Sequence, residues 1–244
     1  METIEPASIS LRMPSERMPH QVSQPHVRFA KRQNSQRGWW VVLLGPDGAG
    51  KSAVITGIGS GRSAGFVGSE TFHLRPTLLR NGRDARANCD PHGQRARGTL
   101  VSVCKLAYLL AVNWLGYLVA VRPQRARGKL VLFDRYFPDC LIDPQRYRLP
   151  PSCVPMAELV AKLLPEPDLY VVLDAPASIL QLRKHEVTLA ETERQRTGYL
   201  MQMARLPNGV VVDAERPLID VVEDVLSRII DLHLTRVRER YEVG

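Results

Sequence analysis

Residues 39–53 read WWVVLLGPDGAGKSA, an apolar run that leads into a glycine-rich turn ending in a lysine and a serine. Residues 45–52 match the phosphate-loop pattern GxxxxGK[ST] in full, between an apolar strand and a helix, as that motif requires. In such a loop, main-chain N–H groups and the helix amino terminus surround a phosphate, the lysine reaches the β- and γ-phosphates, and the serine hydroxyl ligates Mg²⁺. The residues predicted to bind the nucleotide are Gly45, Asp47, Gly48, Ala49, Gly50, Lys51, Ser52 and Ala53.

Further apolar runs follow this first one and indicate more strands. They lie at 70–74, 129–134, 168–174 and 209–213. Continuous β-branched runs with helical stretches between them are typical of a parallel sheet covered on both faces. The sequence therefore predicts an α/β protein of the P-loop NTPase fold, with a five-stranded parallel sheet and helices on both of its faces.

The segments between the strands supply the predicted helices. The first begins at the glycine turn, although each glycine within it costs about 1 kcal/mol relative to alanine. The residues TLAE at 188–191 match a capping box, which predicts that a helix starting near Pro176 breaks near 185–188 and a new one begins. The glycines of the first predicted helix are Gly57, Gly59 and Gly61. Two further helices are predicted over about 99–121 and 217–236.

Composition and charge set the domain organisation. Residues 1–37 are rich in Pro, Ser, Gln and Arg without an apolar period, and we expect a disordered basic tail followed by one folded domain over 38–244. The segment 80–98 shows neither the helical nor the strand periodicity of apolar residues, and it is predicted to be a basic loop. The net charge is +8, and only six of the 33 basic residues are lysines. This excess of arginine favours an anionic ligand, with a merely solvated basic face as the alternative.

Localisation signals are weak. The four cysteines form no CxxC pair, and the first residues lack the pattern of a secretory signal, so we expect a cytoplasmic protein. The apolar run 106–121 has 16 residues, short of the roughly 20 that a bilayer span needs. A buried helix is the first interpretation of this run, and peripheral membrane contact is left open.

A second motif supplies a carboxylate that we expect to lie beside the phosphate loop. The run LVLFDRYFPD places Asp134 at the carboxyl end of a buried strand, where it can hold Mg²⁺ together with Ser52. Arg135 follows directly and can hold the phosphate of a second substrate. The metal ligands predicted from the sequence are therefore Ser52 and Asp134.

With GPDGAGKS followed by DRY at a strand end, the chain resembles the thymidylate kinase family of P-loop nucleoside monophosphate kinases. The resemblance covers roughly residues 38–235. It implies transfer of the ATP γ-phosphate to an acceptor phosphate, a helical lid at about 180–200, and an adenine site near 213–217. It also implies that Asp47 lies near the acceptor and that Arg135 binds donor and acceptor phosphates.

The resemblance implies a catalytic lid arginine as well. The segment LRKHEVTLAETERQR supplies Arg183, Lys184, Arg194 and Arg196, of which Arg183 is our choice. In the alternative interpretation, Glu191 with Arg194 and Glu193 with Arg196 only form pairs along a helix. The predicted catalytic residues are Asp47, Lys51, Asp134, Arg135 and Arg183.

The acceptor is less well defined by the sequence. The Arg-Glu-Pro-Gly-Gly signature common in thymidylate kinases is absent, and only Arg75 and Pro76 match it. The loop 138–150 is dense in charge, and it either faces a substrate or caps the sheet through ion pairs. With HLRP at 73–76, DRY at 134–136 and DPQRYR at 143–148, the chain also resembles thymidylate-kinase-like proteins associated with bacterial surface polysaccharide genes, so a glycan or lipid-linked acceptor competes with dTMP.

We expect ATP and a small phosphate-bearing acceptor, dTMP first, as partners, with Mg²⁺ as cofactor. A nucleotide-gated binding protein without an acceptor is a third hypothesis. Specific nucleic-acid binding is not expected, because Phe29 is the only aromatic residue before Trp39 and base stacking has little support. Homodimer formation is left open.

Overall fold

The structure is a computed structural model that describes residues 37–60, 65–73 and 98–242. All of them belong to one compact unit, Ser35–Gly244. The predicted tail up to residue 36, Gly61, Arg75 with Pro76, and the predicted basic loop up to residue 97 lie outside the described residues.

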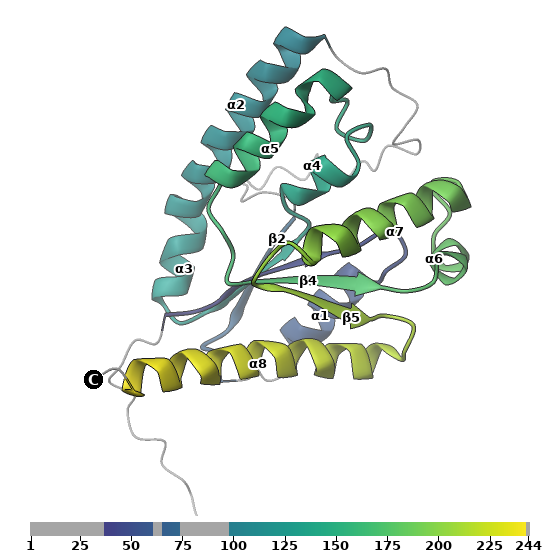
Figure 1. The fold of residues 1–244 in the computed structure, drawn as a ribbon. Coiled ribbons are helices and arrows are strands. Elements are labelled where there is room, and N and C mark those ends of the chain that lie inside the picture. Colours follow the sequence, from purple (N-terminus) through teal and green to yellow (C-terminus); the bar gives the residue numbers. More distant parts are fainter. Residues whose placement is uncertain (1–36, 61–64, 74–97, 243–244) are drawn as a thin grey trace, which may run out of the picture. The chain divides into compact units, whose positions relative to one another are not determined.

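Five parallel strands form the central sheet, in the order β2-β3-β1-β4-β5 (Figure 1). All five predicted strands are confirmed, each within about one residue of its predicted ends. The first strand in sequence, β1, lies between β3 and β4, so the phosphate loop that follows β1 emerges beside the carboxyl end of β3. The strands are β1 (Trp40–Leu44), β2 (Ser69–His73), β3 (Leu130–Asp134), β4 (Leu169–Asp174) and β5 (Gly209–Asp213).

Helices cover both faces of this sheet, as predicted (Figure 1). Because side chains alternate along a strand, Val41 and Leu43 of β1 enter one core while Val42 and Leu44 enter the other. The first core is closed by α1 (Lys51–Ser60) and α8 (Leu218–Glu242). The second is closed by α2 (Thr99–Gly116), the π-helical turn η1 (Tyr117–Val121), α4 (Pro138–Ile142), α5 (Val154–Leu163) and α7 (Leu189–Met203).

The remaining elements are short. They are α3 (Arg122–Ala126), the 3-10 turn η2 (Pro151–Cys153) and α6 (Ala177–Arg183). The predicted break between α6 and α7 is confirmed, because the Thr188 side chain accepts a hydrogen bond from the Glu191 main-chain N–H at 3.2 Å and caps α7. The helices α4 and α5 were not predicted, since their segments are short and interrupted by prolines.

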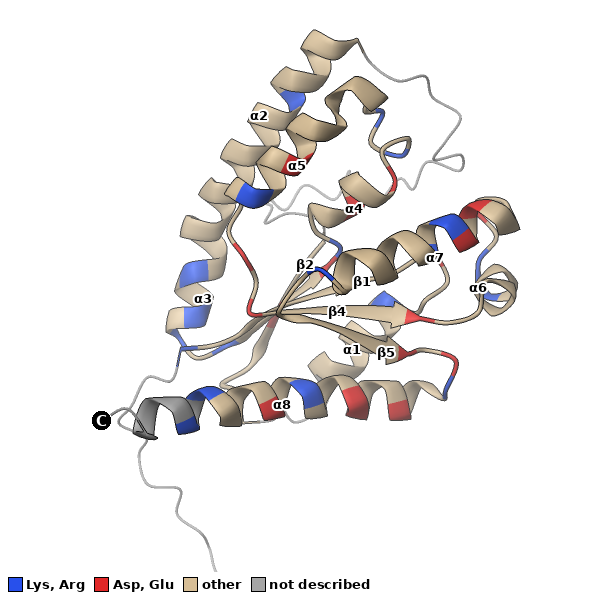
Figure 2. Ribbon diagram, in the orientation of Figure 1, with Lys and Arg blue, Asp and Glu red and all other residues tan. Residues whose placement is uncertain are grey.

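The prediction of a buried helix over 106–121 is wrong. The continuous helical segment Thr99–Ala126 has a mean hydropathy of 1.6 over its most apolar window, yet only 17% of that window is buried. Leu106 and Val121 enter the core, whereas Leu115, Leu118 and Val119 are about half exposed. Charge colouring leaves α2 almost uniformly tan (Figure 2). An apolar run predicts a helix, but not whether enough neighbouring structure exists to cover all its sides.

A glycine sets the distance between α1 and α8. A Cβ added to Gly57 would lie 2.7 Å from Cγ2 of Val222 in α8. The residue therefore weakens α1 by its own propensity but allows the two helices to approach closely. This packing explains a glycine that the sequence marks only as unfavourable.

A buried ion cluster fixes the amino end of the sheet, opposite the phosphate loop. Asp168 accepts hydrogen bonds from Arg125 at 2.5 Å, from Arg236 at 2.7 Å and from the Trp40 main-chain N–H at 2.8 Å. The side chains of Arg125 and Asp168 are 7% and 9% exposed. The charge of Asp168 is thus compensated on several sides, as a buried carboxylate requires.

Candidate active site

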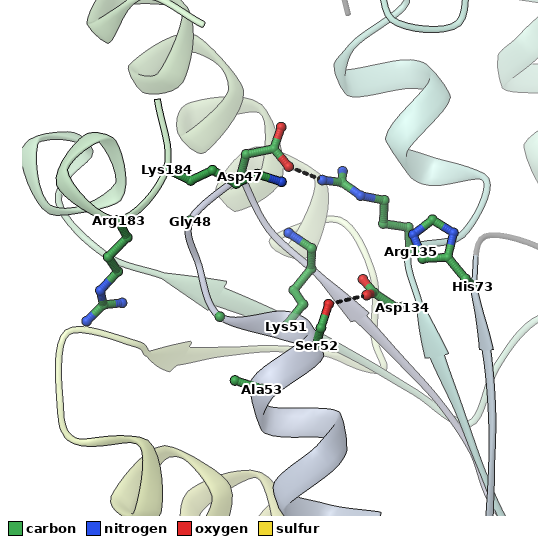
Figure 3. A pocket seen from close by; sticks show the side chains of 11 residues that line it. Asp47, Gly48, Lys51, Ser52, Ala53, His73, Asp134, Arg135, Arg183 and Lys184 are labelled. Atoms are coloured by element: carbon green, nitrogen blue, oxygen red, sulfur yellow. Dashed lines mark hydrogen bonds and ion pairs between the residues drawn. The ribbon is translucent and has the colours of Figure 1, made fainter. Parts of the chain in front are cut away.

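The predicted site residues converge at the carboxyl ends of β1 and β3. A cavity of about 400 Å³ opens there, and Figure 3 shows the side chains that line it. Of the residues predicted from the sequence, all except Gly45 and Ala49 line this cavity, and His73 and Lys184 join them. The lining residues are Asp47, Gly48, Gly50, Lys51, Ser52, Ala53, His73, Asp134, Arg135, Arg183 and Lys184.

The phosphate loop touches α6 at Gly48. This residue has a φ of 84°, a conformation that favours glycine, and a Cβ added there would clash with the Leu180 carbonyl oxygen. The loop can therefore lie directly against the first helix of the predicted lid. A side chain at this position would push the two apart.

Lys51 lies in the middle of the loop and is 7% exposed. Its Nζ donates hydrogen bonds to the carbonyl oxygens of Gly45, at 2.7 Å, and Pro46, at 2.8 Å. Burial, together with the nearby positive charge of Arg135, lowers the pKa of Lys51 to about 7. Its two hydrogen-bond partners are neutral carbonyl oxygens, and an anionic phosphate bound in the loop would place a negative charge beside the ammonium group.

Ser52 and Asp134 form a candidate metal site. The Ser52 hydroxyl donates to Asp134 Oδ2 at 2.7 Å, and Asp134 Oδ1 is buried with no hydrogen-bond partner in the part of the chain that the structure describes. A carboxylate oxygen left without a donor fits a cation or its water shell. The described residues contain no cluster of three His, Cys, Asp or Glu side chains, but Mg²⁺ keeps several waters and needs only one or two carboxylates.

Arg135 connects β3 to the phosphate loop. It donates to Asp139 at 2.6 Å and to the carboxylate of Asp47 (Figure 3). Arg135 adopts a φ of 72°, which is uncommon outside glycine. The chain therefore turns sharply at the end of β3, where the Arg135 side chain meets the phosphate loop. Burial opposes the ionisation of Asp47, but the charges of Arg135, Arg146 and Lys51 outweigh it and hold the pKa of that carboxyl well below its usual value.

Arg146 is a further charged neighbour of the loop that was not among the predicted site residues. Its Nη2 donates to Asp47 Oδ2 at 2.7 Å and to Glu186 Oε2 at 2.8 Å. The loop 138–150 is therefore ion-paired, and its ion partner is the phosphate loop itself. The density of charge in this loop was the available signal, but the partner is 99 residues away in the chain.

The cations of the predicted lid have separate partners. Arg183 lines the cavity, but its guanidinium points away from the phosphate loop and donates to the carbonyl oxygens of Ala214, at 2.8 Å, and Glu215, at 3.4 Å. Those carbonyls belong to the segment 213–217 for which an adenine site is predicted. The structure thus places Arg183 between the cavity and that segment.

The two arginines of α7 form the helix pairs that the alternative interpretation predicted. Arg194 donates to Glu191 at 2.6 Å, and Arg196 donates to Glu193 at 3.3 Å. Arg196 also makes a two-pronged contact with Asp174 at the end of β4, at 2.7 and 3.0 Å. Neither residue lines the cavity, whereas Lys184 does.

The fold matches that of a class of known proteins. No protein-family model matches the chain. A solved thymidylate kinase structure from Candida albicans superposes with a TM-score of 0.59 at 14% identity, covering 80% of this chain and 92% of that one. The fold is therefore the P-loop NTPase fold, as predicted.

The sequence comparison points to the same proteins. A curated relative named probable thymidylate kinase, from Caldivirga maquilingensis, is 29% identical over 134 residues. The matched part covers 52% of this chain and 64% of the relative's length. The resemblance to the thymidylate kinase-like family that GPDGAGKS and DRY predict is confirmed.

Proposed function

We propose that the protein is an ATP- and Mg²⁺-dependent phosphotransferase that moves the ATP γ-phosphate to a phosphate-bearing acceptor, with dTMP as the leading candidate. The observation that carries this proposal is that Lys51, Ser52 and Asp134 lie in the same cavity as Arg135 and Asp47. The first three residues suit a magnesium nucleotide, and Arg135, held in place by Asp47, suits a second phosphate. The resemblance to thymidylate kinases supports the nucleotide kinase assignment.

Positioning and charge carry the chemistry in this kind of reaction. Lys51 exchanges its two carbonyl partners for the β- and γ-phosphate oxygens. Ser52 and Asp134 would hold Mg²⁺, which would neutralise negative charge on the β- and γ-phosphates. Arg135 is held by Asp47 and Asp139 and would bind the donor and acceptor phosphates, as the family resemblance implies.

A lid cation completes the charge around the migrating phosphoryl group. Arg183, the residue chosen from the sequence, reaches that group only after it leaves the Ala214 and Glu215 carbonyls. Lys184, its neighbour, already lines the cavity. Arg183→Gln and Lys184→Gln, compared by kcat at saturating substrates, show which of the two is catalytic.

A coupled assay of ADP release tests the proposal. The substrates are Mg-ATP with dTMP, dUMP, UMP, CMP, AMP, GMP and several sugar phosphates. Lys51→Ala is expected to lose turnover, whereas Lys162→Ala, which removes an exposed lysine of α5, keeps it. Equal turnover in wild type and Lys51→Ala would contradict the proposal.

One observation favours a second candidate, a glycan or lipid-linked acceptor reached at a membrane surface. The half-exposed apolar face of α2 and η1 contains Leu115, Leu118 and Val119, and residues 98–129 contain no Asp or Glu. The basic residues Arg122 and Arg127 follow this face and suit anionic headgroups.

Sedimentation with anionic lipid vesicles at two salt concentrations tests this candidate. Binding is expected to weaken at high salt and to be lost in Leu115→Asp with Leu118→Asp. Met201→Asp, at an exposed apolar residue of α7, is the control. Protein that does not sediment with vesicles but self-associates through the same face would instead assign this face to a homodimer.

A further inference from the structure

The carboxylate of Asp47 is held by two arginines from different loops. Arg135 contacts its Oδ1, and Arg146 contacts its Oδ2 at 2.7 Å. The Asp47 side chain is 10% exposed, and those of Arg135 and Arg146 are 12% and 22% exposed. Two guanidinium groups therefore converge on one side of the phosphate loop.

Arg146 also binds a carboxylate from the predicted lid. Its Nη2 donates to Glu186 Oε2 at 2.8 Å, and Glu186 Oε1 pairs with Lys184 at 2.7 Å. Glu186 lies between α6 and α7, in the segment that joins the two helices. Its carboxylate thus bridges Arg146 and a cation that lines the cavity.

The position of Arg146 is fixed by the fold rather than by Glu186. The Arg146 main-chain N–H donates to Asp143 Oδ1 at 3.1 Å, and Asp143 Oδ2 accepts from the buried Gln195 of α7 at 3.1 Å. This anchoring holds the 138–150 loop against α7. The main chain at Arg146 is therefore held independently of Glu186, and contact with Asp47 keeps the guanidinium beside the phosphate loop.

The two carboxylates at Arg146 differ in how easily they can be replaced. Asp47 belongs to the phosphate loop and is also held by Arg135. Glu186 belongs to a segment between helices, and its other partner, Lys184, is half exposed. A doubly charged phosphate offers Arg146 a stronger acceptor than one carboxylate does, because it carries more negative charge and has three acceptor oxygens.

We propose that Arg146 adds a second guanidinium beside Arg135, the arginine that the resemblance already assigns to the acceptor phosphate, and that Glu186 occupies the Arg146 side of this anion subsite until the acceptor arrives. Displacement of Glu186 also frees the Lys184 ammonium group from its ion pair. The sequence leaves open whether the segment 138–150, which contains Arg146, faces a substrate, and it assigns no role to Glu186. The inference rests on the proposed function for the identity of the acceptor, but not for the binding of phosphate.

A calorimetric titration with inorganic phosphate tests the subsite. The protein is first saturated with Mg²⁺ and a non-hydrolysable ATP analogue, which fills the phosphate loop. Arg146→Gln is expected to weaken phosphate binding roughly tenfold or more, since it removes a charged hydrogen-bond donor. Glu186→Gln is expected to tighten it several-fold, because the competing charge is gone.

A double variant distinguishes competition between Glu186 and phosphate for Arg146 from a general loss of structure. If Glu186 acts through Arg146, Arg146→Gln with Glu186→Gln binds phosphate as weakly as Arg146→Gln alone. Arg228→Gln, which breaks an arginine–carboxylate pair within α8, is expected to leave the affinity unchanged. Thermal melting checks that each variant is folded, and Glu186→Gln keeps the test decisive if Arg146→Gln does not fold.

Several results would overturn the inference: no saturable phosphate binding in wild type, equal affinity in Arg146→Gln, or no gain in Glu186→Gln. Titrations with dTMP and with glucose 1-phosphate then distinguish a nucleotide from a sugar as the source of the phosphate. Phosphate binding without transfer to any acceptor contradicts the proposed function alone. Transfer to dTMP with unchanged phosphate affinities in the variants contradicts this inference alone.

Discussion

Nucleotide binding is predicted to take up a proton at Lys51. In the free protein, burial and the charge of Arg135 lower the pKa of this lysine to about 7, while Asp47, Asp139 and Asp134 oppose the shift. At pH 8 the amine is therefore about nine-tenths neutral, whereas at pH 6 it is about nine-tenths charged. Phosphate oxygens favour the charged amine, so binding at pH 8 takes up close to one proton and binding at pH 6 takes up about a tenth of one.

The affinity follows from the same linkage. Above pH 7, the dissociation constant of a magnesium nucleotide should rise up to about tenfold for each pH unit, because each unit reduces the charged fraction tenfold. Calorimetry in buffers with different ionisation enthalpies measures the proton uptake directly. Lys51→Arg, which stays charged, should show neither proton uptake nor this pH dependence.

His73, at the end of β2, lines the same cavity, so the measurement needs a second control. His73→Gln, measured in the same buffers, separates any contribution of this side chain from that of Lys51. Equal uptake in wild type and Lys51→Arg would refute the reasoning. So would an affinity that is constant from pH 6 to pH 8.5.

Three substitutions test other parts of the structure. Asp134→Asn should raise the Mg²⁺ concentration needed for half-maximal turnover at least about tenfold, measured by metal titration, since a charged ligand is lost; an unchanged value would remove Asp134 from the metal site. Asp168→Ala should lower the free energy of unfolding by about 3–5 kcal/mol in urea titrations, because it leaves buried arginine charge uncompensated, and a loss below about 1 kcal/mol would contradict this. Gly57→Ala should destabilise by about 1–3 kcal/mol through contact with Val222, and Val222→Ala should relieve part of that loss. Gly59→Ala is the matched control, because its Cβ would lie 3.6 Å from the nearest atom and helix propensity should then stabilise by up to about 1 kcal/mol.

Local patterns in the sequence predicted most of the fold. The five strands are continuous apolar runs, and the cap at Thr188 depends on a residue only three positions away. The phosphate loop is likewise a contiguous motif. The parallel pairing of β1 with β3 then brings Ser52 to Asp134, as the two motifs together predicted.

Long-range contacts account for what the sequence did not reveal. The ion pairs of Arg146 depend on how the 138–150 loop folds over the phosphate loop, and no local spacing encodes that approach. The direction of Arg183 depends on carbonyl oxygens of a loop 31 residues later. The exposure of α2 depends on how much neighbouring structure covers it, which hydropathy alone does not measure.

The central claim is phosphoryl transfer in the Lys51 cavity, and transfer of label from γ-³²P-ATP tests it most directly. With Mg²⁺ and dTMP, wild type and Lys162→Ala are expected to form labelled dTDP, and Lys51→Ala is expected to form none. Labelled inorganic phosphate as the only product, with dTMP and with every sugar phosphate tested, would mean hydrolysis without an acceptor. That result would contradict the account.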